Sequence, residues 1–134
     1  MKYLFLIIAL AFTSISENPL NMPVNDHAEL MKEWKVIKMK GVEKLSTSPT
    51  MVFQEKDSKL GGFAGCNNYF STYTLSGNTL SFRNTGTTRK MCPDMSSENT
   101  FLNLLPKIAR YEVVKKELYL YDVKDELLIT AFSM

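Results

Sequence analysis

Residues 61–82 read GGFAGCNNYFSTYTLSGNTLSF and predict the β-hairpin around which the fold is built. In YFSTYTL (69–75), tyrosine, serine and leucine alternate with phenylalanine and threonine, a period of two that is typical of a strand with one buried face. SGN (76–78) is a turn signal, and TLSFRN (79–84) is the returning strand. LGGFAG (60–65) is rich in small residues, which predicts a bend or bulge before the hairpin.

Short apolar and β-branched runs on both sides of this hairpin predict further strands. EWKVIKM (33–39) and TMVFQE (50–55) precede the hairpin, and TGTTRKM (85–91) adds one more strand after it. YEVVKKELYLYD (111–122) predicts a second hairpin, and ELLITAFS (126–133) a final strand. The sequence therefore predicts about seven to nine short antiparallel strands.

One stretch, PDMSSENTFLNLLPKIARY (93–111), changes to a helical period. Asp94 or Ser96 would cap the helix, Glu98 in the first turn suits its dipole, and Pro106 would kink or end it. The apolar stripe comprises Phe101, Leu104, Leu105 and Ile108. An apolar helix among antiparallel strands predicts an α+β, mainly β fold, with a curved antiparallel sheet or partly open β-barrel wrapped around one α-helix.

The N-terminus has the pattern of a secretory signal peptide. Lys2 is followed by an apolar stretch (3–12) that as a helix would span about 15 Å, half of a membrane core. Ser14 and Ser16 occupy the −3 and −1 positions of a cleavage site before Glu17. The predicted parts of the chain are a signal peptide at 1–16, an extended leader at 17–26 and a single domain at 27–134.

The signal peptide predicts that the mature protein is exported to the periplasm or out of the cell. We expect it to be soluble there, because no cysteine near the cleavage site forms the lipobox that a lipid anchor needs. The chain has 16 basic and 14 acidic residues, and the signal peptide contains one of the lysines. Such a balance argues against nucleic-acid binding, which needs a surplus of positive charge. We expect a monomer that does not insert stably in a membrane after cleavage.

Several motifs follow one another in the order of a known family. They are Trp34, GCNNY (65–69), TRKMC (88–92), Glu98 with Phe101 and Leu104 beyond it, and LYLYD (118–122). With them the chain resembles the META domain, the small bacterial envelope domain of the HslJ heat-shock type, over residues 34–132. The resemblance implies an antiparallel, partly open barrel around one helix. It also implies a secreted or lipid-anchored protein without established enzymatic activity, associated in some members with heat stress and tolerance of antibiotics such as novobiocin.

The resemblance further implies structural roles for a set of signature residues. They are Trp34, Gly65, Asn67, Tyr69, Thr88, Met91, Glu98, Phe101 and Leu104. We expect Asn67 to satisfy backbone groups, because asparagine beside a glycine suits a turn. The role of Asn68 stays open.

The two cysteines, Cys66 and Cys92, are expected to form a disulfide, because the protein is exported and no third cysteine is present. A pair of free, buried thiols is the alternative. A catalytic thiol would need a base, and His27, the only histidine, falls beside the proline-containing leader. MCPDM (91–95) offers soft ligands for copper, but a disulfide would remove the thiolate. We therefore expect no metal and no cofactor.

No catalytic motif is present, and we expect a protein that is not an enzyme. The favoured hypothesis is a non-catalytic envelope protein, related to stress or antibiotic tolerance, that acts through contacts with an envelope protein or surface. The alternative is a lipocalin-like carrier of a small apolar ligand. Tyr69, Phe70 and Tyr73 are the candidate pocket residues for that carrier, although strand aromatics more often belong to a core.

Overall fold

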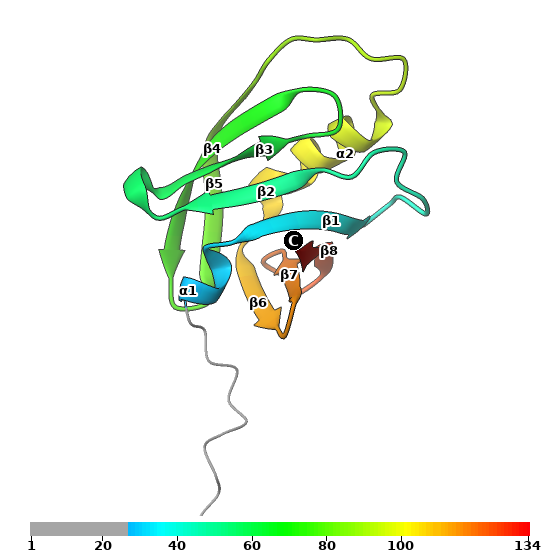
Figure 1. Ribbon diagram of the computed structural model, residues 1–134. Helices are drawn as coiled ribbons and strands as arrows, with labels where there is room; N and C mark the ends of the chain where they lie inside the picture. Colours follow the sequence, from blue (N-terminus) through cyan, green and yellow to red (C-terminus); the bar gives the residue numbers. More distant parts are fainter. Residues whose placement is uncertain (1–26) are drawn as a thin grey trace, which may run out of the picture.

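The computed structural model describes residues 27–134, so the predicted signal peptide and leader lie outside the described residues. Eight antiparallel strands form a closed barrel in chain order, and the last strand pairs with the first (Figure 1). The strands are β1 (Glu33–Met39), β2 (Thr50–Gln54), β3 (Lys59–Phe63), β4 (Asn68–Ser76), β5 (Thr79–Thr87), β6 (Arg110–Val114), β7 (Glu117–Tyr121) and β8 (Leu127–Ser133). The helices are α1 (His27–Leu30), α2 (Ser96–Leu104) and the short 3-10 turns η2 (Lys56–Ser58) and η3 (Leu105–Lys107).

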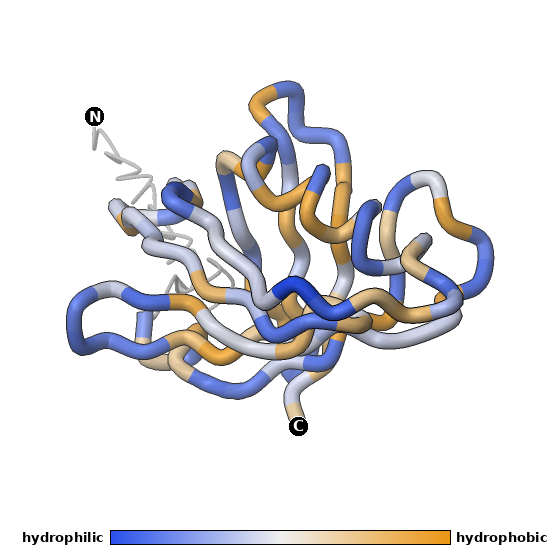
Figure 2. The backbone as a smooth tube through the Cα atoms, turned by 90° about the horizontal axis from the view of Figure 1, so that it is seen from above, coloured by the Kyte–Doolittle hydropathy of each residue, from blue (hydrophilic) through white to orange (hydrophobic). Residues whose placement is uncertain are grey.

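The side chains that fill the barrel interior come from alternate positions along the strands, as the sequence pattern predicts. Along β4 the inward positions 69, 71 and 73 are buried while the outward positions between them are exposed, as predicted for this hairpin. Figure 2 shows short hydrophobic and hydrophilic stretches following one another along the backbone of the domain. The largest fully buried side chains are Trp34, Tyr111, Phe101, Leu30, Met51, Leu60, Leu80, Leu105, Leu118, Leu120, Ile129 and Val36.

The predicted mainly β fold with one longer helix is confirmed, and the barrel closes more fully than predicted. The closure is thinnest between β5 and β6, which share a single residue pair, Thr79 with Arg110. The connection between these strands contains α2, which buries Phe101 and Leu104 in the core. The helix therefore supplies apolar packing where the two strands pair least.

Pro106 explains where the helix ends. The α-helix stops at Leu104, and Pro106 lies in the following 3-10 turn, where its missing N–H costs no helical hydrogen bond. Ile108 is buried as predicted, but its backbone is already extended. The apolar stripe thus continues from the helix into the approach to β6.

One local prediction is only partly right and another is wrong. The bend predicted within residues 60–65 begins at Gly65, but residues 60–63 belong to a regular strand, β3, in which Gly62 takes a φ of 150° and an added Cβ would collide with the backbone of Thr50. Residues 85–91 do not form a separate strand, because the first three extend β5 past an irregularity at Asn84 (φ 55°) and the rest are not strand. Small residues and a bulge concealed the true strand limits in both places.

Candidate functional site

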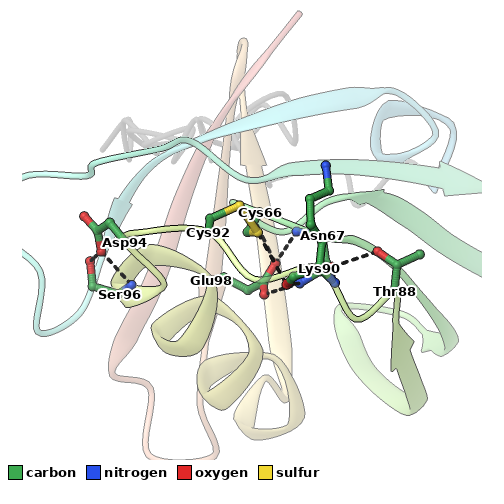
Figure 3. Close-up of a disulfide and its surroundings, with 8 residues drawn as sticks. All are labelled: Cys66, Asn67, Thr88, Lys90, Cys92, Asp94, Ser96 and Glu98. Carbon is green, nitrogen blue, oxygen red and sulfur yellow. Dashed lines mark hydrogen bonds between the residues drawn. A yellow bond between two sulfur atoms is a disulfide. The ribbon is translucent and has the colours of Figure 1, made fainter.

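Four of the signature residues, Gly65, Asn67, Thr88 and Glu98, meet in one cluster beside the disulfide, at the contact between the β3–β4 loop and the start of α2 (Figure 3). Cys66 in this loop is joined to Cys92, which lies between β5 and α2, with a Cα–Cα distance of 6.0 Å. No free cysteine exists in the described residues. The crosslink therefore ties the β3–β4 loop to the segment that leads into the helix.

Glu98 is the acceptor at the centre of the cluster and is almost fully buried, with 3% of its surface exposed. Its Oε1 accepts hydrogen bonds from the backbone N–H groups of Cys66 (3.1 Å) and Asn67 (2.6 Å). Its Oε2 accepts a third, at 2.8 Å, from the Asn67 side-chain amide. A carboxylate from the first turn of α2 thus accepts hydrogen bonds from backbone N–H groups of the β3–β4 loop that have no acceptor within the sheet.

Asn67 connects the same loop to the segment after β5. Its Oδ1 accepts hydrogen bonds from the Lys90 N–H (2.6 Å) and the Thr88 hydroxyl (2.9 Å). Its Nδ2 donates to the Lys90 carbonyl (2.9 Å) as well as to Glu98. The side-chain amide therefore uses its donors and acceptors internally, which matches the backbone-satisfying role expected for it.

Gly65 is needed for this approach of loop and helix. Its φ of 132° lies in the region that favours glycine, and an added Cβ would come within 2.9 Å of the Thr47 hydroxyl and 3.1 Å of the Glu98 nitrogen. Ser97 holds the other side of the helix start, because its Oγ accepts a hydrogen bond from the Ser46 N–H at 3.2 Å. The sequence pattern did not reveal this contact of Ser97 with the β1–β2 connection.

The helix start is arranged differently from the predicted cap. Asp94 Oδ1 accepts hydrogen bonds from the Ser96 N–H (2.9 Å) and hydroxyl (2.6 Å), but the residue at the cap position is Met95, without a side-chain cap bond. Hydrogen bonds from Ser96 hold the pKa of the exposed Asp94 carboxyl below its ordinary value. Asp94 therefore stabilises the first turn from one residue before the cap.

The ionisation of Glu98 reflects two opposed effects. Burial raises the pKa of its carboxyl, but the hydrogen bonds from Asn67 and Cys66 outweigh burial, and the pKa lies below its ordinary value. Hydrogen-bond donors surround both oxygens, so the carboxylate form fits the cluster. A carboxyl held in this way is poorly suited to general acid or base catalysis, which needs a proton to be exchanged with a substrate.

The lowered pKa of Glu98 makes stability depend on pH. The contribution of Glu98 is fully present above the pKa of an unfolded glutamate, about 4.3, and is lost as the pH falls through the lower pKa of the folded state. We expect Glu98→Gln to lower the free energy of unfolding at pH 7 by about 2 kcal/mol, since a glutamine has only one acceptor oxygen and its NH2 group would face either the backbone N–H groups of Cys66 and Asn67 or the Asn67 side-chain amide. Urea unfolding at pH 7, 5 and 3 should show a smaller difference between the variant and the parent at pH 3. An equal difference at all three pH values would contradict the role given to Glu98.

The other signature residues are distributed between core and surface. Trp34 is fully buried, and its indole N–H donates to the Leu30 carbonyl at 3.0 Å, which fixes α1 against β1. Tyr69 packs edge-on against Phe101 with ring centroids 5.0 Å apart. Leu104 also belongs to the core. Met91, in contrast, is 82% exposed and lies outside the core.

The three candidate carrier residues do not form one pocket. Tyr69 and Tyr73 point into the barrel and donate from their hydroxyls to the carbonyls of Thr50 (2.7 Å) and Gln54 (2.8 Å). Burial raises the pKa of the Tyr69 hydroxyl. Phe70 points outward and is 62% exposed. The proposed grouping is therefore wrong, because alternate residues of one strand face opposite sides.

His27 is the first residue of α1, and its Nε2 lies 3.2 Å from the Gly77 carbonyl. It lines a surface cavity of about 440 Å³ together with Met31, Glu55 and Tyr73. Burial, followed by the charge of Glu55, raises the pKa of Tyr73. The sequence separates these residues too widely for any motif to have grouped them.

Within residues 27–134, no group of three or more His, Cys, Asp or Glu side chains could hold a metal ion. None of the helices in this range is long and apolar enough to cross a membrane.

Comparison with known proteins gives one family and several similar folds. The META domain model matches residues 28–133. The NMR structure of a protein from Burkholderia xenovorans is 24% identical, covers 89% of this chain and 94% of its own, and has a TM-score of 0.65. The crystal structure of a DUF4847 family protein from Bacteroides vulgatus is 14% identical, covers 79% of this chain and 94% of its own, and has a TM-score of 0.60. These structural likenesses show a common fold. No curated protein matches the chain.

Proposed function

The chain belongs to the META domain family, and we propose that it is an exported, non-catalytic envelope protein that acts through contacts of its outer surface. The observation that carries this proposal is the internal use of the signature polar groups. Asn67 and Glu98, which are the best-placed polar side chains for chemistry, bond to each other and to neighbouring backbone. A catalytic site would instead require such groups to face a substrate.

The disulfide supports export. Crosslinks of this kind persist in oxidising compartments and are rare in the bacterial cytoplasm. Together with the predicted signal peptide, Cys66–Cys92 favours the periplasm or the medium as the location of the mature protein. A role in envelope stress or antibiotic tolerance is the part of the proposal that rests on the family resemblance.

Packing supports surface contacts over the carriage of a ligand inside the barrel. Trp34, Phe101 and Tyr111, three of the largest side chains, are fully or almost fully buried and fill the interior. Three surface cavities, of about 440, 490 and 480 Å³, are lined by residues of short helices, turns and strand ends. A lipocalin-like carrier would need an interior space of comparable size instead.

We expect the protein isolated from its own cell envelope to begin near Glu17 and to carry the disulfide. Its denatured mass, measured without reductant, should equal that of residues 17–134 less two hydrogens. The measurement is an intact mass spectrum of separated periplasmic, membrane and cytoplasmic fractions. A full-length chain in the cytoplasm, or a mass that includes two free thiols, would refute export.

The stress role can be tested in the native organism by deleting the gene. We expect the deletion strain to grow more slowly than its parent at high temperature or with novobiocin, and the wild-type gene to restore growth. Export of the protein without any such growth difference would leave the location intact and reject the stress role.

A further inference from the structure

The outward face of β3, β4 and β5 has an exposed aromatic ring at its centre. Phe70 on β4 pairs with Gly61 on β3 and with Gly86 on β5, so the strand neighbours on both sides have no side chain. The Phe70 ring lies so close to Gly86 that a methyl group there would collide with it. Phe70 is nevertheless 62% exposed. A ring held over bare backbone in this way is oriented before any ligand arrives.

A second aromatic ring extends this apolar area. Phe63 on β3 is exposed over 37% of its surface and pairs with Asn68, which stands two residues before Phe70 on the same outward face. Cross-strand and diagonal neighbours on one face lie within reach of aromatic side chains. Phe63, Asn68 and Phe70 therefore form one continuous outward area.

Two cations flank the next row of the same face. Lys59 on β3 and Arg83 on β5 both pair with Thr72 on β4. Their Cα atoms are therefore two strand spacings apart, about 10 Å. Both are exposed, and the salt bridges within residues 27–134 pair other side chains. Strands β2 to β5 contain no aspartate or glutamate, and the nearest carboxylates in sequence, Glu55 and Asp57, belong to the β2–β3 turn. This face is complementary to an anionic ligand.

The remaining outward residues decide the class of ligand. Those of β4 and β5 carry mainly hydroxyl and amide groups, namely Asn68, Thr72, Thr74, Ser76, Thr79 and Ser81. Serine and threonine are under-represented among the residues that dominate protein–protein binding energy. Hydroxyl and amide groups around an exposed ring and two cations instead suit a ligand with many hydroxyls and negative charge. We propose that the outward face of β3–β5, centred on Phe70, binds an anionic glycan.

In this arrangement a sugar ring stacks on the Phe70 ring. Thr72 and Asn68 form hydrogen bonds with the hydroxyl groups of that sugar. Lys59 and Arg83 pair with the acidic groups of neighbouring sugars. Export would place this face among envelope glycans, and the binding itself is a property of the purified domain. A failure of binding and a failure of export are therefore separate results.

The test is a ¹⁵N NMR titration of the purified protein with a tetramer of galacturonic acid, with maltotetraose as the uncharged control and tetraglutamate as an acidic peptide. We expect galacturonate to shift the amide signals of β3–β5 and maltotetraose to shift them much less. Phe70→Ala should weaken binding about tenfold, the effect of losing one aromatic contact. Lys59→Gln and Arg83→Gln should each weaken it several-fold.

Two matched variants keep the test decisive. Phe132→Ala removes an exposed phenylalanine on β8, outside this face, and should leave binding unchanged. Phe70→Tyr keeps the ring, so it should bind like the parent even if Phe70→Ala unfolds. The proposal is overturned if the galacturonate tetramer causes no shifts at roughly 10 mM, because a dissociation constant above that concentration is too weak for specific binding. It is also overturned if folded Phe70→Ala and Phe132→Ala bind alike, or if tetraglutamate binds the same face more tightly, which would indicate an acidic protein segment.

Discussion

Phe101→Ala is expected to lower the free energy of unfolding by about 4 kcal/mol, the largest loss anticipated for a single side chain of this protein. Phe101 is fully buried and packs edge-on against Tyr69, with ring centroids 5.0 Å apart. Its removal loses both the transfer of the ring from water and the packing around it, and leaves a cavity between α2 and β4. Urea or thermal unfolding monitored by circular dichroism measures the loss.

Phe70→Ala is the matched control for this prediction, because the same kind of side chain is removed from the outward face of β4 instead of from the core. Phe70 remains 62% exposed, so we expect its loss to cost less than about 1 kcal/mol. Similar losses for the two variants would contradict the description of α2 as part of the core.

Cys66→Ser and Cys92→Ser are each expected to lower the free energy of unfolding by about 3.5 kcal/mol, the value for opening a loop of this length. The crosslinked residues are separated by 26 positions, and the crosslink restricts the unfolded chain between them. Because either substitution removes the same bond, the two losses should be similar. Denaturant unfolding without reductant measures them.

The double variant and the reduced parent serve as controls for the disulfide. Both should show about the same loss as each single variant, because the bond can be removed only once. Clearly unequal losses for Cys66→Ser and Cys92→Ser would mean that one sulfur contributes through local packing instead of through the crosslink.

The parts of the fold that the sequence predicted best are those determined by neighbouring residues. The β4–β5 hairpin depends on alternation and on the turn around Gly77, whose φ is positive, and both signals lie within a few residues. The strand β3 was missed because Gly61 and Gly62 weaken the pattern, although pairing with β2 and β4 holds them in the sheet. Local propensity was overridden there by tertiary pairing.

The site depends on contacts between distant residues, which a single sequence does not reveal. Glu98 was expected to favour the helix dipole, but its carboxylate bonds to Cys66 and Asn67, more than thirty positions away. Outward placement of Phe70 follows from the period of two, yet only the register shows that glycines flank it and that Thr72 stands between Lys59 and Arg83. The spacing of residues along the chain therefore predicts which face of a strand a side chain occupies. Its neighbours on adjacent strands are known only from the strand pairing.

The order of the strands also bears on how the chain reaches its native state. Each strand from β1 to β8 pairs with the next one in sequence, and only the pairing of β8 with β1 joins the ends of the domain. Hairpins between neighbours can form in microseconds, whereas joining the ends must await the ordering of everything between them. The entropic cost of closing a loop grows only slowly with its length. The pairing of β8 with β1 is therefore limited more by the time the two ends need to meet than by the free energy of closure. Ring closure at β1 and β8 is thus the natural slow event in folding, and a newly synthesised chain would remain an open meander until its last strand is in place.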